Sequence, residues 1–165
     1  MSRAVLSIGS NIGDRFAHLQ SVVTALSPYL LAVSPVFRTP PWGSVEQDDF
    51  FNAVLIVSDD DATARNWLAR GQACEVAAAR TREQHWGPRT LDVDVVSVDD
   101  VVSADPVLTL PHPRAYERAF VLVPWLAADA GAALPGVGRV SDLIATLPAD
   151  EVAAVQLLAE FELVR

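Results

Sequence analysis

Apolar segments of two different periods alternate along the first hundred residues, and their order constrains the fold more than any other feature. Residues 4–8 and 51–57 are short apolar runs bounded by polar turns, which is typical of buried strands. Residues 16–26 instead carry large apolar side chains every three or four positions, which predicts an amphipathic helix that ends before Pro28. These segments predict a sheet with helices packed on it.

The remaining segments complete the order. Residues 30–38 are expected to form a second strand, residues 51–57 the third and residues 91–98 a fourth. A second helix is predicted from Asp61, its expected N-cap, to about Ala78. The order strand, helix, strand, strand, helix, strand is that of the ferredoxin-like α-β plait, an α+β fold whose antiparallel sheet is backed by helices on one face. The length of the chain suits a single domain.

Long loops and a less regular C-terminal part flank this pattern. Residues 39–49 contain adjacent prolines, which lack N–H donors, and residues 79–89 lose the apolar period while carrying several arginines. Residues 118–128 are expected to form a third helix, bent or begun near Pro124. The tail from 155 to 163 fits a strand, and a helix fits it nearly as well. The fold is thus expected to carry two long loops.

Charge and residue usage exclude several classes of protein. The net charge is −9, all 12 basic residues are arginine, and lysine is absent. Such an acidic chain does not suit a protein that coats nucleic acid. The missing lysine excludes a P-loop, a protein-kinase site and a Schiff-base enzyme. Arginine and histidine would have to bind any phosphate, and arginine suits this because its planar guanidinium can contact two phosphate oxygens at once.

Cysteine usage and apolar content bear on location. The single cysteine, Cys74, excludes an internal disulfide and a cysteine-cluster zinc site, which favours a reducing cytoplasm. The longest apolar stretch, residues 120–138, is interrupted by Pro124, Asp129 and Pro135, so it does not predict a membrane helix. We therefore expect a cytoplasmic monomer with no nucleic-acid or membrane partner.

Two carboxylates at the end of Trp-Gly-Pro-Arg-Thr-Leu-Asp-Val-Asp, residues 86–94, are the strongest chemical signal. Asp92 and Asp94 are two apart on an expected strand, so both project from one face while Val93 and Val95 project from the other. Such a pair suits magnesium, which takes one or two carboxylates and completes its shell with water and phosphate oxygens. The pair also fits the solvated face of a half-exposed strand, although aspartate is a poor strand former. Periodicity alone leaves both interpretations open.

Basic and aromatic side chains accompany this pair. Five of the 12 arginines fall between positions 80 and 118, a composition that suits polyphosphate chemistry and also surface salt bridges. For Arg114 we favour the salt bridge. Phe50 and Asn52 share one strand face, opposite Phe51, and a ring beside an amide can stack on a flat heterocycle and bind its polar edge.

Several motifs in a fixed order make the sequence resemble a known family. They are Gly-Ser-Asn at 9–11, Arg-Thr-Pro-Pro-Trp-Gly at 38–43, Phe-Asn at 51–52, Arg-x-Arg at 80–82, the nonamer at 86–94, and Pro-His-Pro with Arg-Ala-Phe-Val-Leu-x-Pro within 111–124. With these motifs the chain resembles the hydroxymethyl-dihydropterin pyrophosphokinase family. That resemblance implies transfer of pyrophosphate from ATP, with magnesium, to a pterin alcohol in folate biosynthesis, with release of AMP.

The resemblance also implies roles for individual residues. Asp92 and Asp94 would hold two magnesium ions that bridge the ATP phosphates, and Asp94 is also the candidate base. Arg80 and Arg82 would lie on a mobile loop that closes over the phosphates and assists transfer. The nucleotide site would be lined by Gln72, Glu75, Trp86, Arg89, Val95, Thr109, His112 and Arg118. The pterin would meet the backbone of Thr39, Pro40, Pro41 and Trp42, stack between Phe50 and Phe120, and present its edge to Asn52.

Two other functions compete with this one. A different two-metal enzyme on the same fold, such as a nucleotidyl transferase, would use the aspartate pair without a pterin site. A regulator that binds pterin or nucleotide without turnover would keep the fold and lose catalysis. Intact Asp92, Asp94, Arg80 and Arg82 weigh against such a regulator.

Overall fold

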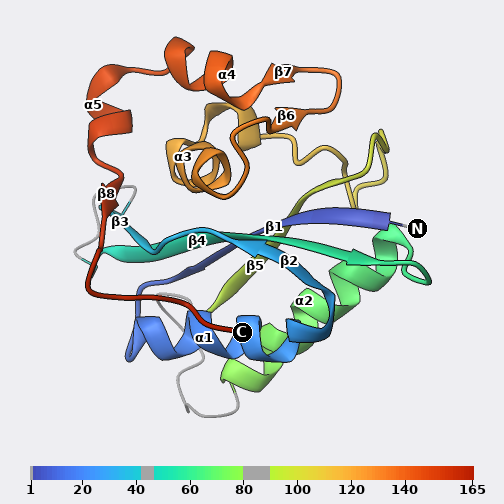
Figure 1. Cartoon of the computed structure of the whole chain (residues 1–165), viewed down its shortest axis with the longest axis horizontal. Helices are drawn as coiled ribbons and strands as arrows, with labels where there is room; N and C mark the ends of the chain where they lie inside the picture. The colour runs from blue at the N-terminus through green and yellow to red at the C-terminus, as the bar shows by residue number, and fades with distance from the viewer. Residues whose placement is uncertain (1, 42–46, 80–89) are drawn as a thin grey trace.

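The computed structural model describes residues 2–41, 47–79 and 90–165 (Figure 1). Their strands form one antiparallel sheet and one small hairpin. The order in the sheet is β5-β1-β4-β3-β8, and β2 pairs with β4 beside β3. The sheet contains β1 (Ser2–Ser10), β2 (Leu30–Val33), β3 (Phe37–Thr39), β4 (Phe50–Asp59), β5 (Asp92–Val98) and β8 (Gln156–Leu157), and the hairpin contains β6 (Ala133–Leu134) and β7 (Gly138–Arg139).

Helices cover both faces of this sheet (Figure 1). On one face lie α1 (Arg15–Ala25) and α2 (Ala64–Ala79). On the other face lies α3 (Ala119–Ala128), with α4 (Val140–Thr146) and α5 (Ala149–Ala153) beside it. Two short 3-10 turns, η1 (Ser27–Tyr29) and η2 (Ala115–Glu117), precede β2 and α3. Among the described residues, none of these helices has both the length and the apolar character needed to span a membrane.

The predicted plait is confirmed, and α3 adds a layer to it. The expected order of strands and helices is found as β1, α1, β2 with β3, β4, α2 and β5. The two helices that back one face of the sheet are α1 and α2. The second layer follows from β4, which is apolar on both faces. Leu55 and Val57 pack in the core under α1 and α2, whereas Val54 and Ile56 pack in the cluster under α3. A strand buried on both faces is stable only when both are covered.

Helix α2 packs unusually close to β5 because a glycine faces the strand. A Cβ on Gly71 would lie 2.9 Å from Cγ1 of Val93, closer than side chains tolerate. The same helix contributes Glu75, whose Oε2 accepts a hydrogen bond of 3.0 Å from the backbone N–H of Val93. The contacts of α2 thereby fix the position of the strand that carries the two aspartates.

Two local predictions are wrong. The expected strand at 30–38 is divided into β2 and β3, because Pro35 has no N–H and the Ser34 side chain takes over pairing. Ser34 Oγ accepts from the N–H of Val54 at 2.9 Å, in place of a backbone carbonyl. The N-cap of α2 is Thr63 rather than Asp61, which lies in the preceding turn. Thr63 Oγ1 accepts from the N–H of Asn66, and Asn66 Oδ1 accepts from the N–H of Thr63, a reciprocal cap.

The C-terminal part contains elements that no sequence pattern indicated. Neither α4 nor α5 was expected, and the tail forms only the two-residue strand β8 against β3. Beyond β8 the chain runs back across α1 (Figure 1). There the Phe161 ring lies 5.0 Å from the ring of Phe16 and 5.3 Å from that of Phe51. Gln20 exchanges two hydrogen bonds with the backbone of Val164. Leu158 and Leu163 of the tail are thus buried in the core under α1 and α2, and Phe161 packs against it.

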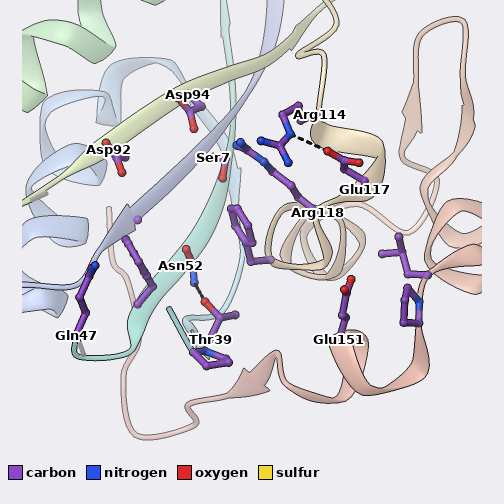
Figure 2. A pocket seen from close by; sticks show the side chains of 16 residues that line it. Ser7, Thr39, Gln47, Asn52, Asp92, Asp94, Arg114, Glu117, Arg118 and Glu151 are labelled. Atoms are coloured by element: carbon purple, nitrogen blue, oxygen red, sulfur yellow. Dashed lines mark hydrogen bonds and ion pairs between the residues drawn. The ribbon is translucent and has the colours of Figure 1, made fainter. Parts of the chain in front are cut away.

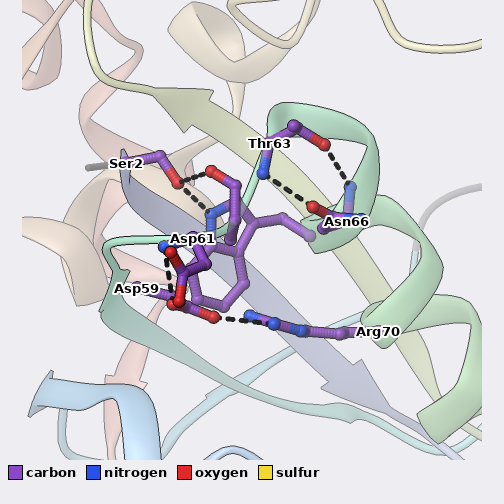
Figure 3. Close-up of polar contacts among 8 residues, drawn as sticks. Ser2, Asp59, Asp61, Thr63, Asn66 and Arg70 are labelled. Atoms are coloured by element: carbon purple, nitrogen blue, oxygen red, sulfur yellow. Dashed lines mark hydrogen bonds and ion pairs between the residues drawn. The ribbon is translucent and has the colours of Figure 1, made fainter.

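An arginine of α2 joins this helix to the end of β4 (Figure 3). Arg70 Nη2 lies 2.7 Å from Asp59 Oδ2, and the Asp59 side chain is only 15% exposed. The guanidinium also covers the rings of Tyr29 and Trp67, at 4.3 and 4.7 Å from their centroids. A hydrogen bond from the N–H of Asp61 and the one from Arg70 hold the pKa of Asp59 below its usual value of 3.8.

Replacing Asp59→Asn should lower the free energy of unfolding at pH 7 and flatten its dependence on acid. A carboxyl with a lowered folded pKa adds stability that is complete above pH 3.8 and is lost as pH falls through the folded value. Urea unfolding between pH 7 and pH 2.5 measures both effects. Asp60→Asn, at an exposed neighbouring carboxylate, is the control and should keep the wild-type slope. Parallel pH curves for wild type and Asp59→Asn would contradict this account.

Candidate active site

A cavity of about 680 Å³ opens between the sheet and the layer of α3 and α5 (Figure 2). Its walls come from β1, β3, β4, β5, the η2 turn and the α4–α5 connection, so residues from nearly the whole chain meet there. A smaller hollow adjoins it and shares Thr39, Pro40, Phe120 and Glu151 with it. A cavity that is concave, partly apolar and lined by a few charged groups is the usual form of a small-molecule site.

The register of β1 places polar residues in rows across the floor of the cavity. Gly9 is paired with Asn52 of β4 on one side and with Asp92 of β5 on the other. Two residues along, Ser7 is paired with Asp94. Since side chains two apart on a strand share a face, all five residues line the same cavity. Sheet pairing alone therefore brings the amide and the two carboxylates together.

The shared face of the aspartates is confirmed. Asp92 and Asp94 line the cavity, while Val93 and Val95 are 5% exposed in the core under α1 and α2. The alternation continues to Val96, which lies on the same face as the aspartates and packs in the cluster under α3, and the bulge that shifts the β1–β5 pairing next to it returns Val98 to the core under α1 and α2. Both carboxylates thus lie at the start of β5, where the strand lines the cavity.

The other wall contains the predicted aromatic and amide pair. Phe50 and Asn52 line the cavity, and Phe51 points into the opposite core, as expected. Asn52 is 3% exposed and donates from Nδ2 to Thr39 Oγ1 at 2.7 Å. A Cβ on Gly9 would lie 3.0 Å from Asn52 Oδ1, so the glycine leaves just enough room for the amide. One of the two amide N–H groups of Asn52 is bound to Thr39, and its carbonyl oxygen serves as an acceptor.

Cationic groups form the η2 side of the cavity. Arg118 and Arg114 both line it, and Figure 2 shows the Arg118 side chain extending across the cavity toward β1 and β5. Burial lowers the pKa of His112, against the opposing effect of Asp94, and the two arginines lower it further. His112 is therefore neutral near pH 7. Its Nδ1 accepts from the N–H of Arg114 at 3.2 Å, which leaves the ring proton on Nε2.

The remaining predicted residues lie elsewhere or outside the described part of the chain. Thr109 Oγ1 donates to the carbonyl of Asp105, Gln72 is exposed on α2, and Glu75 binds β5 as described above. Like Val95 in the core and His112 before the η2 turn, these three do not line the cavity among the described residues, and the nucleotide-binding roles of all five stay predictions. Trp42, Arg80, Arg82, Trp86 and Arg89 lie outside the described residues.

Several lining residues were missed by sequence reasoning. Ser7 and Gly9 share a face of the first strand, so the same period-of-two argument that found the aspartates could have found them. Arg114 forms the surface salt bridge that we expected, with Glu117, yet both also line the cavity. Glu151 comes from α5, and its contribution depends on packing that leaves no local pattern.

Comparison with known proteins decides the family. Residues 5–130 match the family model of 7,8-dihydro-6-hydroxymethylpterin-pyrophosphokinase. The chain belongs to this family. Pyrophosphokinases named for 2-amino-4-hydroxy-6-hydroxymethyldihydropteridine from Mycobacterium tuberculosis and Mycobacterium leprae are 48% and 49% identical to it, covering 91% and 95% of this chain and 87% and 89% of theirs. The pyrophosphokinase of that name from Methylorubrum extorquens is 43% identical over 75% of this chain and 80% of its own.

Solved structures of pyrophosphokinase domains share the fold. A Plasmodium falciparum HPPK-DHPS with bound STZ-DHP superposes with a TM-score of 0.64 at 11% identity, over 86% of this chain and 44% of that one. An HPPK-DHPS in complex with substrates gives a TM-score of 0.68 at 9% identity, over 88% of this chain and 43% of that one. This chain therefore spans less than half of those longer chains, and the likeness concerns the plait alone.

The donor groups in the cavity fit magnesium. Asp92 and Asp94 supply two carboxylates on one strand face, and no cluster of three or more His, Cys, Asp or Glu residues that could hold a metal occurs in residues 2–41, 47–79 and 90–165. Sites built wholly from protein ligands, as for zinc or calcium, need more donors. Magnesium commonly binds through one or two carboxylates together with phosphate oxygens and water. The residues present therefore suit a metal that arrives with a phosphate substrate.

Replacing Thr39→Val should destabilise the fold by about 1–3 kcal/mol, because it leaves the buried amide N–H of Asn52 without a partner. Valine has nearly the shape of threonine, so packing changes little. Thr39→Ser retains the hydroxyl and is the matched control. Urea unfolding at pH 7 measures the difference. If the valine variant were as stable as the serine variant, the Asn52–Thr39 hydrogen bond would not hold this wall of the cavity.

Proposed function

We propose that the cavity is the site of pyrophosphoryl transfer and that Asp92 and Asp94 hold two magnesium ions there. The reaction is that of the family: pyrophosphate passes from ATP to 6-hydroxymethyl-7,8-dihydropterin, giving the pterin diphosphate and AMP, a step of folate biosynthesis. The observation that carries the proposal is the row across β5, β1 and β4. It sets the carboxylate pair beside the ring-and-amide wall within one cavity.

The wall formed by β3 and β4 would bind the pterin. Phe50 and Phe120 both line the cavity and present flat rings to a planar heterocycle. The carbonyl of Asn52 would accept a hydrogen bond from an N–H on the pterin edge, because the bond from one of its two amide N–H groups to Thr39 fixes the orientation of the amide. The backbone at Thr39, Pro40, Pro41 and Trp42 would complete this end; the first two line the cavity and Pro41 the adjoining hollow.

The carboxylates and cations would bind ATP. Bound magnesium would neutralise the charge of the triphosphate that Asp92 and Asp94 otherwise repel. Arg118 would bind phosphate oxygens, and neutral His112 could donate from Nε2. Gln72, Glu75, Trp86, Arg89, Val95 and Thr109 are proposed for the rest of the nucleotide site, and Arg80 and Arg82 for closing over the phosphates and assisting transfer.

The chemistry needs positioning more than covalent help. The pterin hydroxymethyl oxygen would form a bond to the β-phosphorus while the bond between that phosphorus and the oxygen bridging it to the α-phosphate breaks, releasing AMP. Asp94 is the proposed acceptor of the hydroxyl proton. Holding the two substrates in line and excluding water would supply most of the rate. Family membership does not favour a nucleotidyl transferase or a non-catalytic regulator.

Three further statements belong to the same proposal. We infer that residues 1–165 act as one pyrophosphokinase domain, that the protein works as a monomer, and that it is cytoplasmic. The single cysteine, which is buried, supports the cytoplasmic location, and the single sheet that supplies the cavity supports one domain. The proposed reaction requires only small-molecule partners, ATP and 6-hydroxymethyl-7,8-dihydropterin.

Replacing Asp94→Asn should lower pterin-dependent AMP formation by about a thousandfold or more, because a carboxylate ligand to magnesium is lost. Binding of the pterin alone should change less than about twofold, since Asp94 lies outside the ring-and-amide wall. AMP release with mass analysis of the pterin product measures turnover, and calorimetry measures binding. Asp142→Asn, at an exposed carboxylate of α4, is the control. Wild-type turnover by Asp94→Asn would remove this residue from the metal site.

Replacing Gly9→Ala should weaken pterin binding by about tenfold, because the new methyl group would press on the Asn52 carbonyl 3.0 Å away. Binding of an ATP analogue should be nearly unchanged. Gly131→Ala is the matched control, since a Cβ there meets only an ordinary contact at 3.6 Å. Equal pterin affinity in both variants would place the pterin away from the Gly9–Asn52 row.

A further inference from the structure

We propose that Arg114, held by Glu117, is a further binding residue for the polyphosphate of ATP. This inference rests on the proposed function, and it adds a residue for which the sequence favoured a surface salt bridge and to which the resemblance gave no role. Three observations support it: the place of the η2 turn in the cavity, the form of the Arg114–Glu117 pair, and the balance of charge around it.

The η2 turn brings three charged side chains to one side of the cavity. Arg114, Glu117 and Arg118 all line it, and Figure 2 shows them gathered on the side nearest α3. The turn is anchored by Ala115, which is 1% exposed and accepts a hydrogen bond from the N–H of Arg118 at 3.1 Å. The N–H of Arg114 is itself bound to His112 Nδ1. The backbone that carries Arg114 is therefore well fixed, and only its side chain is free to reorient.

The pair with Glu117 leaves most of the guanidinium available. Arg114 Nε donates to Glu117 Oε1 at 2.7 Å, and the side chains are 63% and 40% exposed. Within the described residues, neither Nη group of Arg114 makes a hydrogen bond, so both can bind phosphate oxygens. An exposed ion pair three residues apart contributes little stability and is readily rearranged. Glu117 thus directs the guanidinium without competing strongly with a phosphate ligand.

The charge balance requires Arg114 once a phosphate is present. In the described part of the chain Arg118 forms no salt bridge, and its guanidinium carbon lies 5.6 Å from the centroid of the Phe120 ring. Glu117 on the same side of the cavity would repel a polyphosphate if Arg114 did not neutralise it. Together the pair is neutral and offers two Nη groups, whereas Glu117 alone adds an unfavourable charge. Removing Arg114 should therefore cost more than one lost contact, and removing Glu117 as well should restore part of the loss.

Calorimetry with α,β-methylene-ATP, AMP and magnesium tests this in the full-length protein. Arg114→Ala should weaken binding of the analogue by about tenfold or more, the scale of one charge-assisted hydrogen bond, and leave AMP binding within about twofold. The affinity of Arg114→Lys for the analogue should fall between those of the wild type and Arg114→Ala, since the lysine ammonium keeps the charge but lacks the planar guanidinium that can bind two oxygens. The double variant Arg114→Ala/Glu117→Gln should bind the analogue more tightly than Arg114→Ala. Arg139→Ala, which removes an exposed arginine of β7 outside the cavity, controls for net charge.

Two results would overturn the proposal: wild-type affinity of Arg114→Ala for the analogue, or equal losses for the analogue and AMP. Thermal unfolding of each variant separates loss of fold from loss of binding. Turnover by the wild type is measured in parallel. Absence of pterin-dependent AMP formation in the wild type would refute the proposed function. Normal wild-type turnover with no effect of Arg114→Ala would refute the role of Arg114 alone.

Discussion

The pairing of β1 between β4 and β5 is the constraint on which the rest of the structure depends. Its register sets Gly9 beside Asn52 on one side and Asp92 on the other, and so joins segments that are distant in the sequence. A slip of one residue between β1 and β5 would turn Asp92 and Asp94 into the core and Val93 into the cavity. The same register therefore buries Val93 and Val95 and places the two carboxylates in the cavity. Selection for a stable core and selection for the site both preserve this register.

The two faces of the sheet serve different purposes. Under α1 and α2 the sheet is apolar along its length, and this face contributes the larger core, including the fully buried Trp67. Under α3 the apolar cluster covers only part of the sheet, and the remainder forms the floor of the cavity. A plait with helices on a single face would leave that floor as an open surface. The added layer of α3 and α5 turns it into a concave site that can surround a ligand.

Sequence periodicity predicted those parts of the site that lie within single strands. Asp92 with Asp94, and Phe50 with Asn52, were found because strand geometry alone decides which side chains share a face. The contribution of Glu151 was not predictable, since it depends on how α5 packs against α3, and no local pattern encodes that contact. Strand boundaries failed for a similar reason: Pro35 could have indicated the break, but the hydrogen bonds of the Ser34 side chain that replace pairing are tertiary.

The course of the tail has a consequence for how the protein is made. Strand β8 pairs with β3, Phe161 completes an aromatic cluster with Phe16 and Phe51, and Gln20 binds Val164, so the tail packs on segments from the first third of the chain. During translation these contacts can form only after residues 156–164 have been made. A chain that stops short of them lacks part of its core, and because the contacts join residues far apart in the sequence, folding is completed late. Strand β3, which contributes Thr39 to the cavity, therefore gains its second neighbour only when this segment has been synthesised.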